Sequence, residues 1–354
     1  MTDKPAPAVA SFDRSRSGPC LITGASGFLG GHLAQRLASD GYAVRCLVRD
    51  RSDTSLLDAL DVQLVVGDLT APASLAPAVD GCRFVVHCAA LVSDWATVAE
   101  IKRVNVEGTR RLLEACVDAS VQRVVHVSTT DIYGYPGRAA VGEDHVPAGF
   151  RNWYSQTKLL AEAVVRRVER ERGLEVVILR PATIYGPRSI EVVGEIARAL
   201  RGGHMLLINA GRADAGLCYV ENVVDAALLA MSSEAAPGNA FNVTDGLAVT
   251  WRQFTDGLAD ALGCRRARRS VPYDVANVIG FSLEHGYRFL RRTTGLETAP
   301  LLSRQAVAVL GVDQDFSNQK ARDMLGWAPH VDYPTGLDRT VSWLAAEYFT
   351  LGRR

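Results

Sequence analysis

Short apolar runs rich in β-branched residues alternate with longer helix-period segments from residue 19 onward. Such continuous runs are typical of parallel strands that are covered on both faces, because a half-exposed strand alternates polar and apolar residues. The helical segments that separate them lie at 28–40, 73–80, 97–119 and 153–173. The alternation predicts an α/β fold with a doubly wound parallel Rossmann sheet. The six runs are "CLITGA", "AVRCLVR", "VQLVVGD", "FVVHCAA", "RVVHVST" and "EVVILRPA".

The strand-helix rhythm loosens after residue 187, which predicts a second domain. We expect residues 19–187 to form the sheet domain, with a return segment near 213–245. Residues 188–212 and 246–354 are expected to form a smaller, mostly helical substrate-binding domain. Residues 1–18 mix Pro, Ala, Ser and charges without an apolar core, so we interpret them as a disordered tail rather than a signal peptide.

Composition excludes several classes of function. The formal net charge is zero, which gives no electrostatic argument for a nucleic-acid partner. The seven cysteines are scattered and odd in number, so we expect free thiols in a reducing compartment and a cytoplasmic protein, not a disulfide framework. The histidines show no metal-ligand spacing, and no apolar stretch reaches the roughly 18 to 20 residues of an integral membrane segment.

A glycine-rich turn follows the first predicted strand, in the stretch "TGASGFLGGHL". Gly24, Gly27 and Gly30 have the spacing G-x-x-G-x-x-G between a strand and a helix. Glycines there permit a tight turn and leave backbone N–H groups and the positive helix end open to a pyrophosphate. The alternative is a tight structural turn without a ligand.

The tips of the next two strands indicate which dinucleotide is bound. The second strand ends at Arg49, where a guanidinium can pair with a 2′-phosphate, so we expect NADP(H) to be preferred. Asp50 follows directly and keeps NAD(H) possible. Asp68 ends the third strand and can accept a hydrogen bond from the adenine amino group.

Tyr154 and Lys158 are four residues apart on a predicted helix, so they lie on one helix face. An ammonium beside a phenol stabilises the phenolate, and we expect it to lower the pKa of Tyr154 towards the working range. Such a tyrosine can exchange a proton with a carbonyl or an alcohol while a hydride moves. Ser128, Thr129 and Thr130 end the preceding strand, where a hydroxyl can bind the same substrate oxygen.

Together these motifs make the chain resemble the extended short-chain dehydrogenase/reductase family, from residue 19 to the end. The resemblance is carried by "TGASGFLG", "GDL", "HCAAL", "NVEGT", "STTDIYG", "YSQTK", "RPATIYGP" and "YVENVVDA", in the family's order. It implies that Tyr154 is the general acid/base, Lys158 its partner on the ribose, and Thr129 the hydroxyl that binds substrate oxygen. The cofactor-binding residues that it implies, besides Lys158, are Gly24, Ser26, Gly27, Phe28, Leu29, Gly30, Arg49, Asp68, Leu69, Ala89, Ala90, Asn105, Pro181 and Ile184.

Within that family the chain looks most like the branch of 3β-hydroxysteroid dehydrogenases, 2-alkyl-3-oxoalkanoate reductases and dihydroflavonol reductase-like enzymes. The resemblance implies an oxidoreductase that interconverts a secondary alcohol and a ketone on a small, hydrophobic substrate. It also implies a homodimer through helices 97–119 and 153–173. A dehydratase has the pattern T-D-E after the strand, whereas this chain has Thr129-Thr130-Asp131.

Two other functions stay open at this point. One is a nucleotide-sugar epimerase with retained NAD, for which Arg212 is a possible phosphate ligand. The other is a dinucleotide-sensing regulator without catalysis, which the presence of Thr129, Tyr154 and Lys158 disfavours.

Residues 264–292 form a basic-flanked apolar helix candidate. It can cover a hydrophobic substrate or rest on a membrane surface. We expect instead an ordinary amphipathic helix of the second domain. Arg180 is interpreted as structural.

Overall fold

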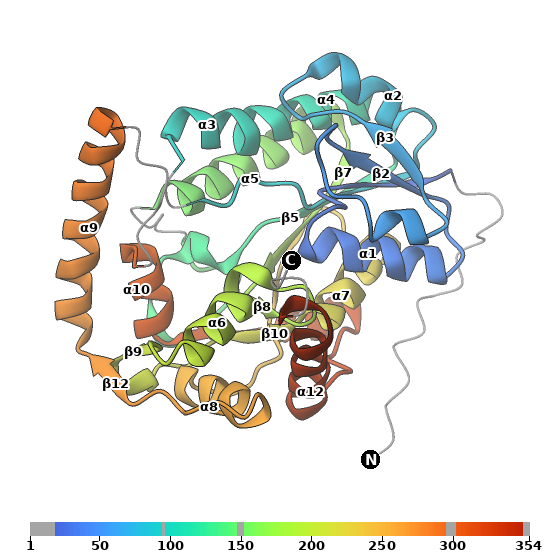
Figure 1. Cartoon of the computed structure of the whole chain (residues 1–354). Coiled ribbons are helices and arrows are strands. Elements are labelled where there is room, and N and C mark those ends of the chain that lie inside the picture. The colour runs from blue at the N-terminus through green and yellow to red at the C-terminus, as the bar shows by residue number, and fades with distance from the viewer. Residues whose placement is uncertain (1–17, 94–95, 147–151, 295–301, 350–354) are drawn as a thin grey trace.

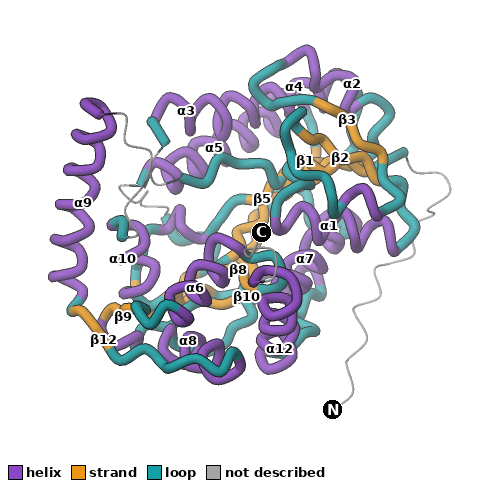
Figure 2. The backbone as a smooth tube through the Cα atoms, viewed as in Figure 1, coloured by secondary structure: helices purple, strands orange, loops and turns teal. Residues whose placement is uncertain are grey.

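A seven-stranded parallel sheet forms the centre of the molecule, in the order β11-β7-β5-β4-β1-β2-β3 (Figures 1 and 2). The computed structural model describes residues 18–93, 96–146, 152–294 and 302–349, so residues 1–17 of the expected tail lie outside it. The doubly wound fold is confirmed. The strands of the sheet are β1 (Cys20–Thr23), β2 (Val44–Val48), β3 (Gln63–Val66), β4 (Phe84–His87), β5 (Arg123–Val127), β7 (Glu175–Pro181) and β11 (Ala240–Val243).

Two hydrophobic cores cover the two faces of the sheet, because the strands present apolar residues on both sides. On β1, Ile22 faces one core and Leu21 faces the other. Helices α1 and α7 cover the first face, and α2, α4 and α5 cover the second. Their bounds are α1 (Phe28–Ser39), α2 (Leu75–Val79), α3 (Val98–Lys102), α4 (Thr109–Asp118), α5 (Trp153–Arg172) and α7 (Val220–Ser232), with a π-helical turn (Arg103–Gly108) joining α3 to α4.

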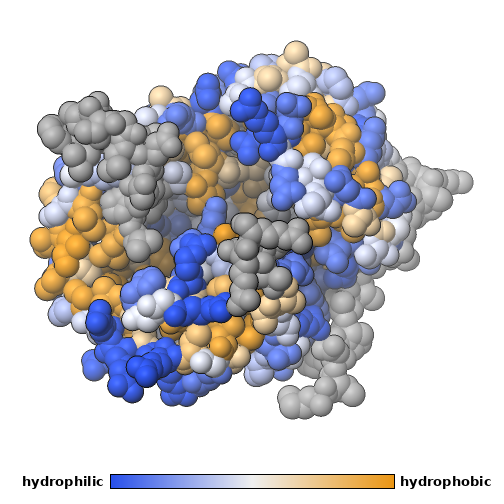
Figure 3. All heavy atoms as spheres, viewed as in Figure 1, coloured by the Kyte–Doolittle hydropathy of each residue, from blue (hydrophilic) through white to orange (hydrophobic). Residues whose placement is uncertain are grey.

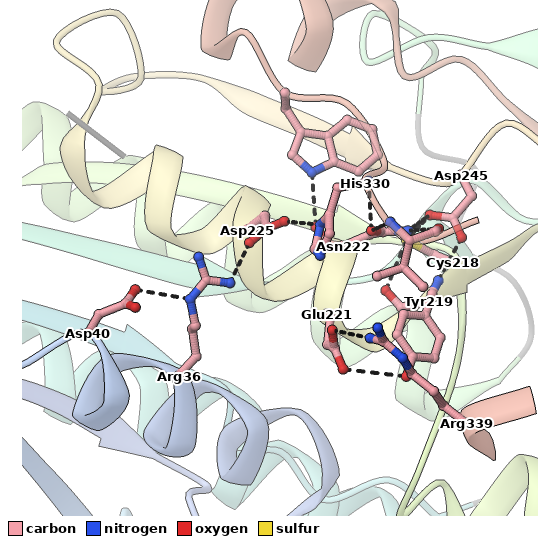
Figure 4. A network of polar contacts seen from close by, with 12 residues as sticks. Arg36, Asp40, Cys218, Tyr219, Glu221, Asn222, Asp225, Asp245, His330 and Arg339 are labelled. Carbon is pink, nitrogen blue, oxygen red and sulfur yellow. Dashed lines mark hydrogen bonds and ion pairs between the residues drawn. The ribbon is translucent and has the colours of Figure 1, made fainter. Parts of the chain in front are cut away.

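The seventh strand, β11, and helix α7 come from the segment expected to return to the sheet. Asn222 on α7 fixes this return segment to the C-terminal part of the chain (Figure 4). Its Nδ2 donates to Asp245 Oδ1 (2.9 Å) and to the carbonyl of Val331 (3.0 Å), and its Oδ1 accepts the backbone N–H groups of His330 and Val331. Asn222 is fully buried, so all four hydrogen bonds are shielded from water.

Another set of elements packs beyond the carboxyl ends of the strands. Its helices are α6 (Glu195–Arg201), α8 (Trp251–Ala261), α9 (Tyr273–Thr294), α10 (Arg304–Gly311), α11 (Gln319–Leu325) and α12 (Tyr333–Trp343). We expected this region to be mostly helical, but it also contains three short strands, which belong to two of the three two-stranded parallel pairs in the described structure. Their strands are only three to five residues long, too short for a recognisable pattern in the sequence. The pairs are β8 (Thr183–Tyr185) with β10 (Leu217–Tyr219), β9 (Leu206–Ile208) with β12 (Arg269–Val271), and β6 (Gly137–Val141) with β13 (Gln314–Phe316).

All seven cysteines are free thiols, and five of them are buried. Among the described residues, no helix has the length and apolar character needed to cross a bilayer. No cluster of His, Cys, Asp or Glu in the described part of the chain has the geometry of a metal site.

Candidate active site

A cavity of about 2020 Å³ opens at the carboxyl ends of the parallel strands. Ligands bind in this position in doubly wound sheets, because the loops after the strands converge there. Two regions of the cavity are recognisable: one surrounds the turn between β1 and α1, and the other surrounds Tyr154 on α5. The residues expected at the site that line this cavity are Gly24, Ser26, Gly27, Phe28, Leu29, Gly30, Arg49, Asp68, Leu69, Ala89, Ala90, Thr129, Tyr154, Lys158, Pro181 and Ile184.

The glycine-rich turn brings the backbone of the first strand against its neighbours. Gly24 has φ +73°, and a Cβ there would lie 2.8 Å from the backbone nitrogen of Ala89. A Cβ on Gly30 would lie 2.2 Å from the carbonyl oxygen of Gly24. Both positions therefore require glycine for packing alone. Gly27 is different, because its nearest neighbour would be 3.2 Å away, and it stands at the N-cap of α1.

Helix α1 begins at this turn without a side-chain cap and with no acidic residue in its first turn. Its first N–H groups and the positive end of its dipole therefore face the cavity, where they can bind an anion. This uncapped helix end fits the pyrophosphate of a dinucleotide.

Two arginines and one aspartate surround the other end of the same region. Arg49 follows β2, and Arg103 lies in the π-helical turn; both line the cavity. Asp68 accepts hydrogen bonds from the N–H and the hydroxyl of Thr70, at 2.6 and 2.7 Å. These bonds and the nearby guanidinium groups of Arg49 and Arg103 lower the pKa of Asp68, although burial opposes them. Asp50, the acidic alternative to Arg49, is not part of the cavity wall.

The N-terminus of α5 positions Tyr154 and Lys158. Asn152 caps this helix, and its Oδ1 accepts the backbone N–H of Tyr154 at 2.5 Å. One turn later, Lys158 is buried and its Nζ donates to the carbonyl of Val127 at the end of β5, at 2.5 Å. The helix therefore holds both side chains over the tip of that strand.

The three hydroxyls after β5 do not lie in equivalent places. Thr129 lines the cavity, and its Oγ1 accepts the backbone N–H of Asp131 at 3.2 Å. Ser128 also lines the cavity, and its buried Oγ has no hydrogen-bond partner within the described structure. Thr130 is buried outside the cavity wall. Ser128 therefore joins Thr129 as a hydroxyl that can bind a substrate oxygen.

The expected effect of Lys158 on Tyr154 is absent from this structure. Burial raises the pKa of Tyr154 above its ordinary value, and the carboxylates of Asp131 and Glu191 raise it further. The Nζ of Lys158 is directed to Val127 instead, and burial lowers the pKa of Lys158 to about 8. The prediction of a lowered tyrosine pKa is wrong for the protein alone, because helix spacing does not reveal how strongly both groups are desolvated.

Asn105 lies behind the cavity wall rather than in it. Its Oδ1 accepts the N–H of Leu91 (2.7 Å), and its Nδ2 donates to the carbonyl of Leu91 (3.1 Å) and to Thr157 Oγ1 (3.2 Å). It thereby ties the loop after β4, which carries Ala89 and Ala90, to α5. Asn105 positions this loop, and the expectation that it lines the cofactor site is not met.

Arg180 anchors α5 to the sheet. Its guanidinium forms two hydrogen bonds with the Glu162 carboxylate, from Nε at 3.0 Å and from Nη2 at 2.7 Å. A third goes from Nη1 to the hydroxyl of Tyr133, at 2.6 Å. All three side chains are buried. The structural interpretation of Arg180 is confirmed, since this pair fixes the helix that carries Tyr154.

Several cavity residues were not expected from the sequence. Asp131 accepts hydrogen bonds from the Tyr135 hydroxyl (3.1 Å) and from Gln305 Nε2 (3.3 Å). Glu191 and Arg188 also line the cavity, and Arg188 has φ +70°. The segment "RPATIYGPR" contains Arg188 directly after its Gly-Pro pair, which was the available signal. Arg212, considered above as a phosphate ligand, lines a separate cavity of about 550 Å³.

Comparison with known proteins shows which family the chain is similar to. A model of the NAD dependent epimerase/dehydratase family matches residues 20–244. The chain is 34% identical over 322 residues to 4-hydroxy-2-methyl-3-oxo-4-farnesyl-3,4-dihydroquinoline-1-oxide ketoreductase of Stigmatella aurantiaca, covering 90% of this chain and 94% of that protein. It is 30% identical to 2-alkyl-3-oxoalkanoate reductase of Stenotrophomonas maltophilia, covering 92% and 99%.

A similar solved structure is the dTDP-glucose 4,6-dehydratase DesIV of Streptomyces venezuelae, determined with NAD and TYD bound. It aligns with a TM-score of 0.77 at 25% identity, and the alignment covers 94% of this chain and 98% of that one. The similarity therefore extends over both the sheet and the elements beyond it.

Proposed function

The chain belongs to the NAD-dependent epimerase/dehydratase family, within the extended short-chain dehydrogenase/reductases, and from this premise we propose the roles of its site residues. It is an NAD(P)-dependent oxidoreductase that interconverts a secondary alcohol and a ketone. One observation carries the proposal: Tyr154, Lys158 and Thr129 line the same cavity as the uncapped N-terminus of α1. A dinucleotide bound at the glycine-rich turn would supply or accept the hydride.

Tyr154 is the proton donor in the proposed reaction. Its raised pKa keeps the phenol protonated at neutral pH, which suits donation to the oxygen of a carbonyl that is being reduced. Thr129 Oγ1 and Ser128 Oγ hold that oxygen. Lys158 donates to ribose hydroxyls from the same helix face.

The proposed cofactor is NADP(H). Arg49 and Arg103 place two guanidinium groups beside Asp68, which supports binding of a 2′-phosphate. Asp50 stands outside the wall, so no carboxylate at that position competes for the 2′-hydroxyl. Asp68 accepts the adenine amino group in this proposal.

The proposed substrate is a small hydrophobic ketone. Apolar side chains from several elements line the cavity that holds Tyr154, among them Val92, Ile190, Val192 and Val309. The ketoreductase and the 2-alkyl-3-oxoalkanoate reductase named above, by their names, act on carbonyl compounds that carry a farnesyl or an alkyl group. Both observations support this substrate class.

We further propose a homodimer that forms through α4 and α5. Leu160 on α5 exposes 43% of its surface in the single chain, and Trp153 exposes 36%. These two apolar side chains support a contact between copies on this helix. The free cysteines support a reducing compartment, and we place the protein in the cytoplasm.

Replacement of Tyr154 by Phe tests the assignment. We expect turnover of a hydrophobic ketone to fall by roughly 10²–10⁴-fold, because the proton donor is lost. Binding of NADPH, measured by titration, should stay within about threefold of the native value, since it rests on other groups. Tyr348→Phe is the matched control, because it removes a hydroxyl from another part of the same cavity wall. Near-native turnover of Tyr154→Phe would show that the assignment is wrong.

A second candidate is a nucleotide-sugar epimerase that keeps NAD bound. The likeness to the dehydratase determined with NAD favours it, whereas the position of Arg212 outside the cavity removes one argument for it. Denaturing the freshly purified protein separates the two: released NAD supports the epimerase, and a protein free of nucleotide that prefers NADPH supports the reductase.

A further inference from the structure

Helix α9 leaves five large apolar residues of its described part exposed and buries a carboxylate, contrary to the expectation of an ordinary amphipathic helix. The helix begins at Tyr273, after β12, so residues 264–272 of the expected segment are not helical. The side that packs against the protein includes the carboxylate of Glu284, which binds Arg304 at 3.1 Å. The buried residues of this side are Ala276, Gly280, Glu284 and Tyr287.

A stripe of exposed residues along α9 carries no charge in its described part. Its residues follow the spacing i, i+3, i+4, i+7, i+8 and i+11, so they form one stripe along the helix. Val278 exposes 65% of its surface and Val275 exposes 49%. The stripe consists of Val275, Val278, Ile279, Ser282, Leu283 and Gly286, all exposed. We call it the α9 stripe.

Single exposed hydrophobic residues are common on protein surfaces, but a row of them on one element marks an interaction surface. Helix α9 lies at the edge of the molecule beside α10 (Figure 1), and hydrophobic residues gather over that edge (Figure 3). Phe281 is exposed too, at the border of the stripe, where Arg304 lies 5.3 Å from its ring centre.

An exposed group of arginines precedes the helix. Arg265, Arg268 and Arg269 are exposed and have no ion-pair partner among the described residues, whereas Arg266 pairs with Asp260. In Figure 3, hydrophilic residues gather below the hydrophobic edge, near β12. An uncharged apolar stripe with free arginines at its end has the charge and polarity of a helix that lies in a lipid headgroup layer.

We propose that the α9 stripe docks on an anionic lipid surface, with Arg265, Arg268 and Arg269 on the headgroups. Since no described helix is suited to span a bilayer, the contact is peripheral. This inference rests on α9 and its flanking arginines, and it goes beyond the proposed reaction.

Two other partners for the α9 stripe fit the observations less well. A second copy of the chain would bring basic ends together whether the two α9 helices ran parallel or antiparallel, because the sequence also has Arg291 and Arg292 near the end of α9. The catalytic cavity is not the partner either: Tyr287 on α9 lines that cavity, whereas no residue of the stripe does.

The position of Tyr287 connects the docking surface to the catalytic cavity. One side of α9 contributes to the wall of the cavity, and the other side would contact lipid. A hydrophobic substrate dissolved in the bilayer would therefore meet the protein next to the cavity. Only this entry of substrate from the bilayer depends on the proposed substrate class; the docking itself does not.

The test is flotation of the full-length protein with vesicles of phosphatidylcholine, with and without phosphatidylglycerol. We expect binding to the anionic vesicles that weakens with salt. Val278→Glu should weaken it at least about tenfold, by placing a charge in the stripe, and Val278→Leu should preserve it. Replacing Arg265, Arg268 and Arg269 by Ser should weaken it about fivefold per arginine. The matched control is Val66→Glu on β3, a site with 64% exposure far from α9 in the sequence.

Three results would overturn the proposal. The first is that the native protein does not float with anionic vesicles. The second is that the Val278→Glu and Val66→Glu variants bind the vesicles equally well. The third is that sedimentation shows a dimer that Val278→Glu dissociates, while the vesicles bind neither the native protein nor this variant. Reduction of a water-soluble ketone by the same variants is measured in parallel. If the native protein did not reduce this ketone, the proposed reaction would be refuted, whereas the docking proposal would be unaffected.

Discussion

Replacing Lys158 by Met should stabilise the protein while removing its activity. Lys158 is 3% exposed, and burial lowers its pKa to about 8 from the ordinary 10.5. At neutral pH the folded protein therefore still holds an ammonium ion, at a desolvation cost that the unfolded chain does not carry. Methionine has a similar shape and no charge, so it avoids this desolvation cost.

The magnitude follows from the pKa difference. A depression from 10.5 to about 8 corresponds to about 3 kcal/mol of stability lost at about pH 7. Methionine also loses the hydrogen bond to Val127, worth about 1 kcal/mol. We expect Lys158→Met to raise the free energy of unfolding by about 2 kcal/mol at about pH 7.

The pH dependence has a definite sign. Between about pH 8 and 10.5 the unfolded chain binds more protons at Lys158 than the folded protein does, so the stability of the native protein rises with pH. Between about pH 7 and 9.5, the free energy of unfolding of the native protein should therefore rise by about 2 kcal/mol relative to that of the Lys158→Met variant.

Urea unfolding of nucleotide-free protein at both pH values measures these differences. Lys102→Met, at an exposed position on α3, is the control and should change stability by less than about 0.5 kcal/mol at either pH. A Lys158→Met variant less stable than the native protein at neutral pH, or a stability difference independent of pH, would refute the reasoning.

Three further substitutions test other parts of the account. Arg49→Ala should weaken NADPH binding by roughly 10–100-fold and leave NADH binding nearly unchanged, because only the contact with the 2′-phosphate is lost. An equal loss of affinity for NADPH and NADH would contradict the NADP assignment. Asn222→Ala should lower the free energy of unfolding by about 3 kcal/mol or more, since it removes one hydrogen bond from the buried carboxylate of Asp245 and three from the backbone of His330 and Val331. Calorimetry measures this, and a loss below about 1 kcal/mol would count against it. Glu162→Gln should cost about 3 kcal/mol or more in urea unfolding, because it leaves the buried Arg180 guanidinium without its counter-charge; an unchanged midpoint would show that this pair does not hold α5.

The sequence predicted the sheet because buried parallel strands form unbroken apolar runs, and those runs are separated by helices of the expected length. It also predicted most of the residues that line the cavity, because strand tips and the start of α1 and α5 are local features. Tyr154 and Lys158 share a helix face by their spacing alone. The short strands β8, β9, β12 and β13 were missed, since three residues do not establish a period.

The errors concern properties that depend on the tertiary environment. Asn105 belongs to a motif near the cofactor, yet its amide bonds to Leu91 and Thr157 behind the wall. The pKa of Tyr154 depends on burial and on Asp131 and Glu191, which are distant in sequence. For α9, the periodicity showed that one side is apolar but not which side meets the protein. The structure shows which side of α9 packs against the protein, because Glu284 is buried there.

The central claim is that this protein transfers a hydride between a dinucleotide and a ketone, with Tyr154 as proton donor. The most direct measurement is incubation with C4-deuterated NADPH and a hydrophobic ketone, such as a 3-oxosteroid or a 2-alkyl-3-oxo acid. Mass spectrometry then locates the deuterium. We expect deuterium on the carbinol carbon of the product with the native protein, and a rate of deuterium transfer that is roughly 10²–10⁴-fold lower with Tyr154→Phe. Absence of deuterium transfer to any ketone, together with interconversion of sugar nucleotides by protein that retains NAD, would contradict it.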